Sequence, residues 1–166
     1  MTVANQKSEQ LQIRITPEQK ARLKAAATAA DLSVSEWVLS ALFAPGEEQF
    51  QDYLARLARG ENHKIVLAEL SDFLAALEPS AFQTCVASPP SLALSPFLAN
   101  YVAAMVEVAA HQKSQDPPPW TRSISPLAEP YFGASLKSLR LYLLANSPPP
   151  FRRRNIFIDA SVGERV

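Results

Sequence analysis

The sequence of 166 residues has one cysteine, four glycines and two histidines, and each shortage excludes a class of protein. The single Cys85 cannot form an internal disulfide, which is typical of proteins from a reducing cytoplasm. Four glycines leave no glycine-rich loop of the kind that binds nucleotide phosphates. His63 and His111 are far apart, and neither has a second ligand four residues away, so the sequence predicts no metal site.

The chain also lacks a net charge and an unbroken apolar run. Its 16 Lys and Arg balance 16 Asp and Glu, so the chain has no overall positive charge that would indicate nucleic-acid binding. Pro96, Asn100 and Glu107 interrupt the apolar stretch 91–110, and a charge at membrane depth costs on the order of 3 kcal/mol. The first ten residues have no apolar core typical of a secretory signal. We therefore expect a cytoplasmic protein without a membrane span.

No arrangement of side chains indicates catalysis. Cys85 lies on the apolar side of a short predicted helix, where a small buried side chain is the ordinary interpretation, and no base for a nucleophilic thiol can be identified. Asp52, Glu69 and Asp72 could be imagined as an acid and a base, but a charged helical face is the commoner reason for such residues. The sequence therefore predicts a protein that is not an enzyme and has no cofactor.

Near the N-terminus, residues 10–15 alternate between polar and apolar side chains, the period-two pattern of a strand with one apolar face. The apolar positions are Leu11, Ile13 and Ile15. The polar positions are Gln10, Gln12 and Arg14. No hairpin partner follows, and a lone strand leaves unpaired backbone groups. We expect the same strand of a second molecule to pair with it, as an antiparallel ribbon in an obligate homodimer.

Two helices are predicted directly after this strand, and each opens with a capping box. Thr16 and Gln19 have the spacing of the first box, with Pro17 at the first helical position. Ser33 and Glu36 repeat the spacing before the second helix, which Pro45-Gly46 should end. The order strand, helix, tight turn, helix is complete by about residue 44.

Residues 10–43 resemble the ribbon-helix-helix DNA-binding family, the Arc and MetJ type of bacterial repressors and antitoxins. The resemblance implies that the dimer inserts its ribbon into the major groove of double-stranded DNA. The base-contacting residues would then be Gln10, Gln12 and Arg14. This chemistry is suitable, because Gln can pair with adenine and Arg with guanine at their major-groove edges.

The resemblance also implies that backbone amides at the start of the second helix bind a DNA phosphate, which suits a helix N-terminus. Here these phosphate-binding residues would be Ser33, Val34 and Ser35. One departure is Asp31, which stands in the turn where the family often has Gly. Its negative charge near the DNA backbone is expected to weaken the affinity.

The rest of the chain predicts a mainly α protein. A helical module is expected over residues 46–114, with amphipathic helices that include 64–77 and one that begins at Ser95-Pro96. Their apolar stripes are sufficient for a small core or for an extension of the dimer interface. Residues 115–166 form a proline-rich segment with one helix, about 134–146, between extended parts. With the ribbon-helix-helix domain over residues 1–45, the prediction is a chain of three parts.

The proline-rich tail is predicted to bind a protein partner, because such segments often wrap a partner and become ordered on contact. Its candidate partner-binding residues are Trp120, Phe151, Arg152, Arg153 and Arg154. The arginine run can equally be a solvated stretch before a short strand, or a second nucleic-acid contact.

Ribbon-helix-helix proteins with long C-terminal extensions are typically antitoxins whose extension covers a toxin. The resemblance therefore implies an antitoxin that represses its own promoter and neutralises a protein toxin. The alternative is a plain dimeric transcriptional repressor, whose C-terminal part is a dimerisation or effector domain.

Overall fold

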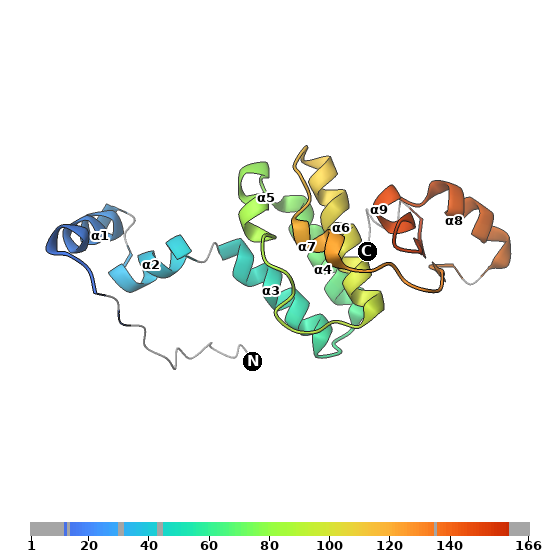
Figure 1. Ribbon diagram of the computed structural model, residues 1–166, viewed down its shortest axis with the longest axis horizontal. Helices are drawn as coiled ribbons and strands as arrows, with labels where there is room; N and C mark the ends of the chain where they lie inside the picture. Colours follow the sequence, from blue (N-terminus) through green and yellow to red (C-terminus); the bar gives the residue numbers. More distant parts are fainter. Residues whose placement is uncertain (1–11, 13, 30–31, 43–44, 135, 160–166) are drawn as a thin grey trace. The chain divides into compact units, whose positions relative to one another are not determined.

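The computed structural model describes residues 12, 14–29, 32–42, 45–134 and 136–159, and the chain divides into two compact units, residues 1–42 and 43–166 (Figure 1). Residues 46–114 and 115–166, expected as separate parts, thus belong to one unit. The fold is mainly helical, as predicted. Among the described residues, none of the helices combines the length and apolar character that a membrane span requires.

The first unit contains helices α1 (Pro17–Ala29) and α2 (Val34–Leu42), and both predicted capping boxes are confirmed. The amide of Thr16 donates to Gln19 Oε1 at 2.9 Å, and the amide of Gln19 donates to Thr16 Oγ1 at 3.2 Å. Ser33 and Glu36 make the same pair of bonds at 3.0 and 3.2 Å. Each box satisfies two amides that a helix start otherwise leaves without a partner.

The predicted ribbon strand lies partly outside the described residues, because Gln10, Leu11 and Ile13 are not among them. Gln12 and Arg14 are exposed and have no regular secondary structure. A strand that pairs only with a second molecule has no ladder within one chain. The ribbon therefore stays a prediction.

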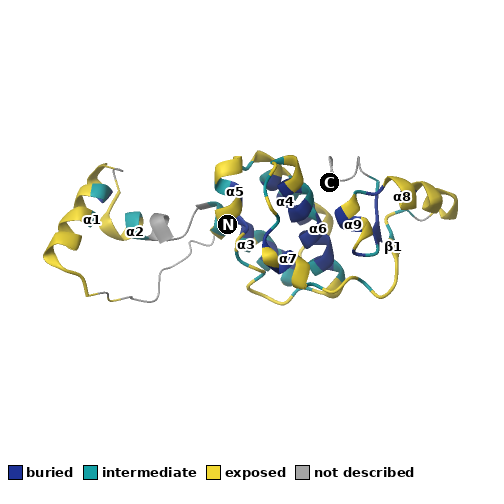
Figure 2. Cartoon of the chain, turned by 45° about the horizontal axis from the view of Figure 1, so that its top comes forward, coloured by how far each residue is buried: buried dark blue, intermediate teal, exposed yellow. Residues whose placement is uncertain are grey.

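The second unit is built around α6 (Pro96–Gln112), which packs against α4 (His63–Ala76), α7 (Pro119–Ser123) and α9 (Pro149–Arg152). Helices α3 (Pro45–Ala58) and α5 (Pro79–Cys85) pack against each other, and α3 also packs against α4. Successive α6 residues from Tyr101 to Ala104 are all buried, because neighbours cover more than one face of the helix (Figure 2). This covering by three neighbours makes α6 the centre of the core.

Past α7 the chain forms β1 (Tyr131–Phe132), a 3-10 turn η1 (Lys137–Leu139), α8 (Arg140–Asn146) and β2 (Ile156–Phe157). The strands pair in parallel, with Tyr131 opposite Ile156. The strand predicted as one interpretation of the sequence after the arginine run is confirmed. The proline-rich segment is not extended throughout, because Pro119 and Pro149 open helices α7 and α9, whereas residues 115–118 and 125–127 have no regular secondary structure. Proline suits the first helical turn, where its missing N–H costs nothing.

Candidate nucleic-acid interface

The described base-contacting candidates, Gln12 and Arg14, are exposed just before α1. Gln10 lies outside the described residues. Residues 12–29 include four basic side chains and one acidic side chain, Glu18, although the whole chain has no net charge. The basic residues are Arg14, Lys20, Arg22 and Lys24, and all four are exposed. This local excess of positive charge is what attraction to a DNA backbone requires.

The predicted phosphate-binding residues, Ser33, Val34 and Ser35, are exposed at the start of α2. The first-turn amides of Val34 and Ser35 have no acceptor within the helix, so they are suited to hold an oxyanion. The Ser33 amide instead donates to the Glu36 carboxylate. A phosphate at this helix start would therefore meet two amides and the nearby negative charge of the Glu36 carboxylate, which is a consequence of the capping box.

An apolar groove lies on the first unit beside these polar residues. Its volume is about 440 Å³, and its lining includes Ile15, Leu23, Ala26 and Trp37. Ile15 is 42% exposed, and Leu32 and Val34 are also exposed. Large apolar side chains gathered along an exposed groove, as Ile15, Leu23 and Trp37 are here, usually mark a site of association.

The tail residues predicted to bind a partner are distributed differently from expectation. Trp120 and Phe151 are buried: the Trp120 indole Nε1 donates to the Val86 carbonyl at 2.9 Å, and Phe151 packs edge-on against Tyr101. Both are therefore core residues and not a surface for a partner, because burying large aromatic surface stabilises the fold more than leaving it in water. Arg152 and Arg153 are exposed, and their contact with a partner stays a prediction.

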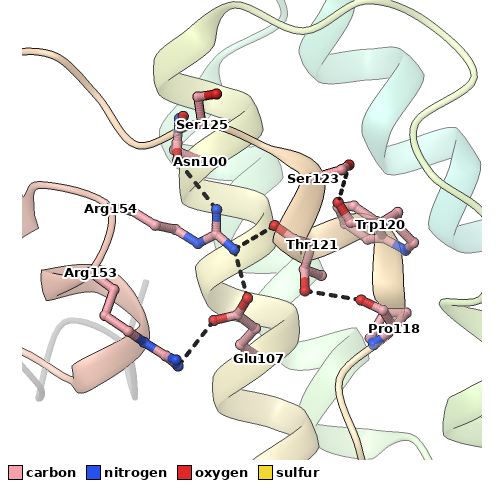
Figure 3. Close-up of polar contacts among 9 residues, drawn as sticks. All are labelled: Asn100, Glu107, Pro118, Trp120, Thr121, Ser123, Ser125, Arg153 and Arg154. Carbon is pink, nitrogen blue, oxygen red and sulfur yellow. Dashed lines mark hydrogen bonds and ion pairs between the residues drawn. The ribbon is translucent and has the colours of Figure 1, made fainter.

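Arg154 is also buried, and it forms the main polar contact between the tail and α6 (Figure 3). Its Nη2 donates to Glu107 Oε1 at 2.6 Å and to the Thr121 carbonyl at 2.7 Å. Its Nη1 lies 3.3 Å from Asn100 Oδ1. Both side chains of the ion pair, Glu107 and Arg154, are only 7% exposed. The pair therefore joins segments 47 positions apart in the sequence.

The thiol of Cys85 and possible metal ligands are the remaining candidates for a reactive site. Cys85 is buried, as predicted, and burial followed by the nearby charge of Glu47 raises the pKa of its thiol. A raised pKa disfavours the thiolate that a nucleophile needs. Within the described part of the chain, no group of three or more His, Cys, Asp or Glu side chains is placed to hold a metal ion.

Comparison with known families bears on the first unit. The NikA-like family model, described as Mobilization protein NikA, matches residues 5–45, about a quarter of the chain. No curated protein and no solved structure matches the sequence. The matched segment contains the alternating residues, both capping boxes and both helices of the first unit. Residues 5–45 are therefore similar to a ribbon-helix-helix DNA-binding segment of the NikA-like kind.

Proposed function

We propose that the protein is a homodimer that binds a specific DNA sequence through its N-terminal unit and a protein partner through its C-terminal unit. One observation carries the DNA-binding half: two helices with reciprocal capping boxes directly follow an alternating segment with Gln12 and Arg14 on its polar side. The match of residues 5–45 to the NikA-like model supports the same conclusion.

A gel-shift titration of the full-length protein against its own promoter, with a scrambled duplex as control, tests this half. Specific complexes typically form at 10³- to 10⁷-fold lower concentration than nonspecific ones. Equal affinity for both duplexes would contradict sequence-specific binding.

Dimerisation is supported by the apolar groove of the first unit. The substitution Ile15→Lys is expected to abolish the dimer, because an unpaired charge is too costly to bury in an apolar interface. Light scattering on the variant should give the mass of a monomer, or the protein should lose its folded state. Ala25→Lys is the matched control, since it adds the same charge at an exposed position of α1 that does not line the groove. An unchanged dimer in Ile15→Lys would contradict an interface on this face.

Protein binding by the second unit is supported by exposed apolar side chains just before η1, in η1 and in α8. They are Leu136, Leu139, Leu141, Tyr142 and Leu144. Leu141 is 79% exposed, and exposed apolar side chains gathered in one segment are typical of a protein-binding surface. Lys137 and Arg140 are the charged residues of this segment, so the partner should have an apolar groove with an acidic rim.

Three finer functions are candidates. The description of the matched family favours a protein that takes part in DNA mobilization. An antitoxin could use the exposed apolar side chains of α8 to bind a toxin. A plain repressor would need neither mobilization proteins nor a toxin. An adjacent toxin-like gene would favour the antitoxin, and adjacent mobilization genes would favour the first candidate.

The double substitution Leu141→Ser, Leu144→Ser is expected to leave the fold intact and to reduce recovery of the neighbouring gene product at least tenfold in co-purification. Both side chains are exposed, so their loss should change the stability by less than about 0.5 kcal/mol. Ile65→Ser is the matched control, because Ile65 is an exposed apolar residue on α4. Equal recovery with all three proteins would contradict partner binding through α8.

A further inference from the structure

A hollow of about 220 Å³ opens on the second unit beside the contact between Arg154 and Glu107. Its polar lining consists of Glu107, Thr121, Arg122, Arg153 and Arg154. In Figure 3, Arg153 and Arg154 reach Glu107 from the C-terminal segment, and the Thr121 carbonyl of α7 accepts from the same Arg154 nitrogen as Glu107. Two separate segments of the chain therefore supply guanidinium groups to one hollow.

The charges in this hollow do not balance. Three guanidinium groups and one carboxylate, that of Glu107, line the hollow, which leaves a surplus of two positive charges. Arg154 takes Glu107 Oε1 at 2.6 Å, whereas the Arg153 Nη2 lies 3.5 Å from Oε2. Arg122 has no ion pair with any other described residue. Glu107 therefore pairs mainly with Arg154.

Hydrogen-bond donors are also left over. A guanidinium has five N–H donors. Arg154 uses its two terminal nitrogens, but its Nε is buried without a hydrogen-bond partner among the described residues. The Arg153 side chain is 66% exposed with one long contact. The hollow therefore offers the exposed guanidinium groups of Arg122 and Arg153, and their positive charge, to an incoming oxyanion.

We propose that this hollow binds a phosphate group. Arg122 belongs to α7 and Arg153 follows α9, and a phosphate has enough oxygens to accept hydrogen bonds from both guanidinium groups. The surplus of two charges is also matched by one phosphate dianion or by neighbouring phosphodiesters of a DNA strand. DNA is the favoured source, and this choice rests on the proposed function. Free phosphate is the other source of the same chemistry.

Calorimetric titration of the full-length protein with inorganic phosphate tests the site itself. Arg122→Gln and Arg153→Gln should each weaken phosphate binding about tenfold, which is the effect of losing one charge-assisted contact of about 1.4 kcal/mol. The control Arg59→Gln removes an exposed arginine of the same unit that does not line the hollow, and its affinity should equal that of the parent. Equal affinities in all four proteins, or no binding to the parent protein, would overturn the proposal. Displacement of phosphate by a poly-glutamate peptide at a lower concentration than by pyrophosphate would also overturn it in favour of an acidic protein.

The salt dependence of DNA binding identifies the source of the phosphate. If the hollow contacts the DNA backbone, Arg122→Gln combined with Arg153→Gln should make the slope of log K against log salt concentration shallower by about 0.9 for each lost phosphate contact. An unchanged slope together with weakened phosphate binding would assign the site to free phosphate. If the parent protein binds no DNA, the proposed function fails, yet the phosphate titration still decides this site.

Discussion

Replacing Glu107 with alanine is expected to lower the free energy of unfolding of the second unit by about 3 to 5 kcal/mol, because it leaves the buried Arg154 without its counter-charge. The guanidinium is 7% exposed and cannot return to water without breaking its bonds to Thr121 and Asn100. Urea denaturation followed by circular dichroism measures the change. The midpoint of the unfolding transition should move to a lower urea concentration. The slope of the unfolding free energy against urea concentration should change little.

Two further variants separate the ion pair from simple packing. Arg153→Gln should change the stability by less than about 0.5 kcal/mol, because Arg153 is largely exposed and contacts Glu107 at only 3.5 Å. Combining Glu107→Leu with Arg154→Met should restore part of the loss, since apolar side chains of similar volume often replace a buried pair without penalty. A loss below about 1 kcal/mol in Glu107→Ala would contradict the view that this pair anchors the C-terminal segment to α6.

The double substitution Gln12→Ala, Arg14→Ala is expected to abolish sequence-specific DNA binding by the folded protein. Each lost base contact costs about 1 to 3 kcal/mol, and a dimer loses four of them. At about 1 kcal/mol each, the specific affinity should fall roughly a thousandfold. Both side chains are exposed, so the melting temperature should barely change. A gel-shift titration with the specific and the scrambled duplex measures the effect.

The matched control is Lys20→Ala combined with Lys24→Ala, which removes two exposed charges from α1. Loss of such charges weakens binding to specific and scrambled DNA by similar factors, because contacts to phosphates are independent of base sequence. If the Gln12 and Arg14 variant behaves in the same way as this control, the alternating segment is not the part of the protein that contacts bases.

The amino-acid sequence alone determined the local features of this protein. Both capping boxes were predictable, because each depends on two residues three positions apart. Helix α4 was predicted over 64–77 and found at His63–Ala76, since its apolar spacing and its limits are written in consecutive residues. The resemblance of residues 10–43 to a DNA-binding family depended on the same short-range pattern, and the NikA-like match covers that segment.

Only the tertiary structure decided how the C-terminal third of the chain packs. Its prolines and aromatics suggested an extended tail, but Trp120 and Phe151 are part of the core, and Arg154 reaches Glu107 across 47 positions. A pattern of neighbouring residues gives no information on contacts between such distant positions. These contacts stabilise the fold only when α6 presents both an apolar surface and a carboxylate. Glu107, interpreted from sequence as an interruption of an apolar run, therefore acquires its role as an anchor from the fold.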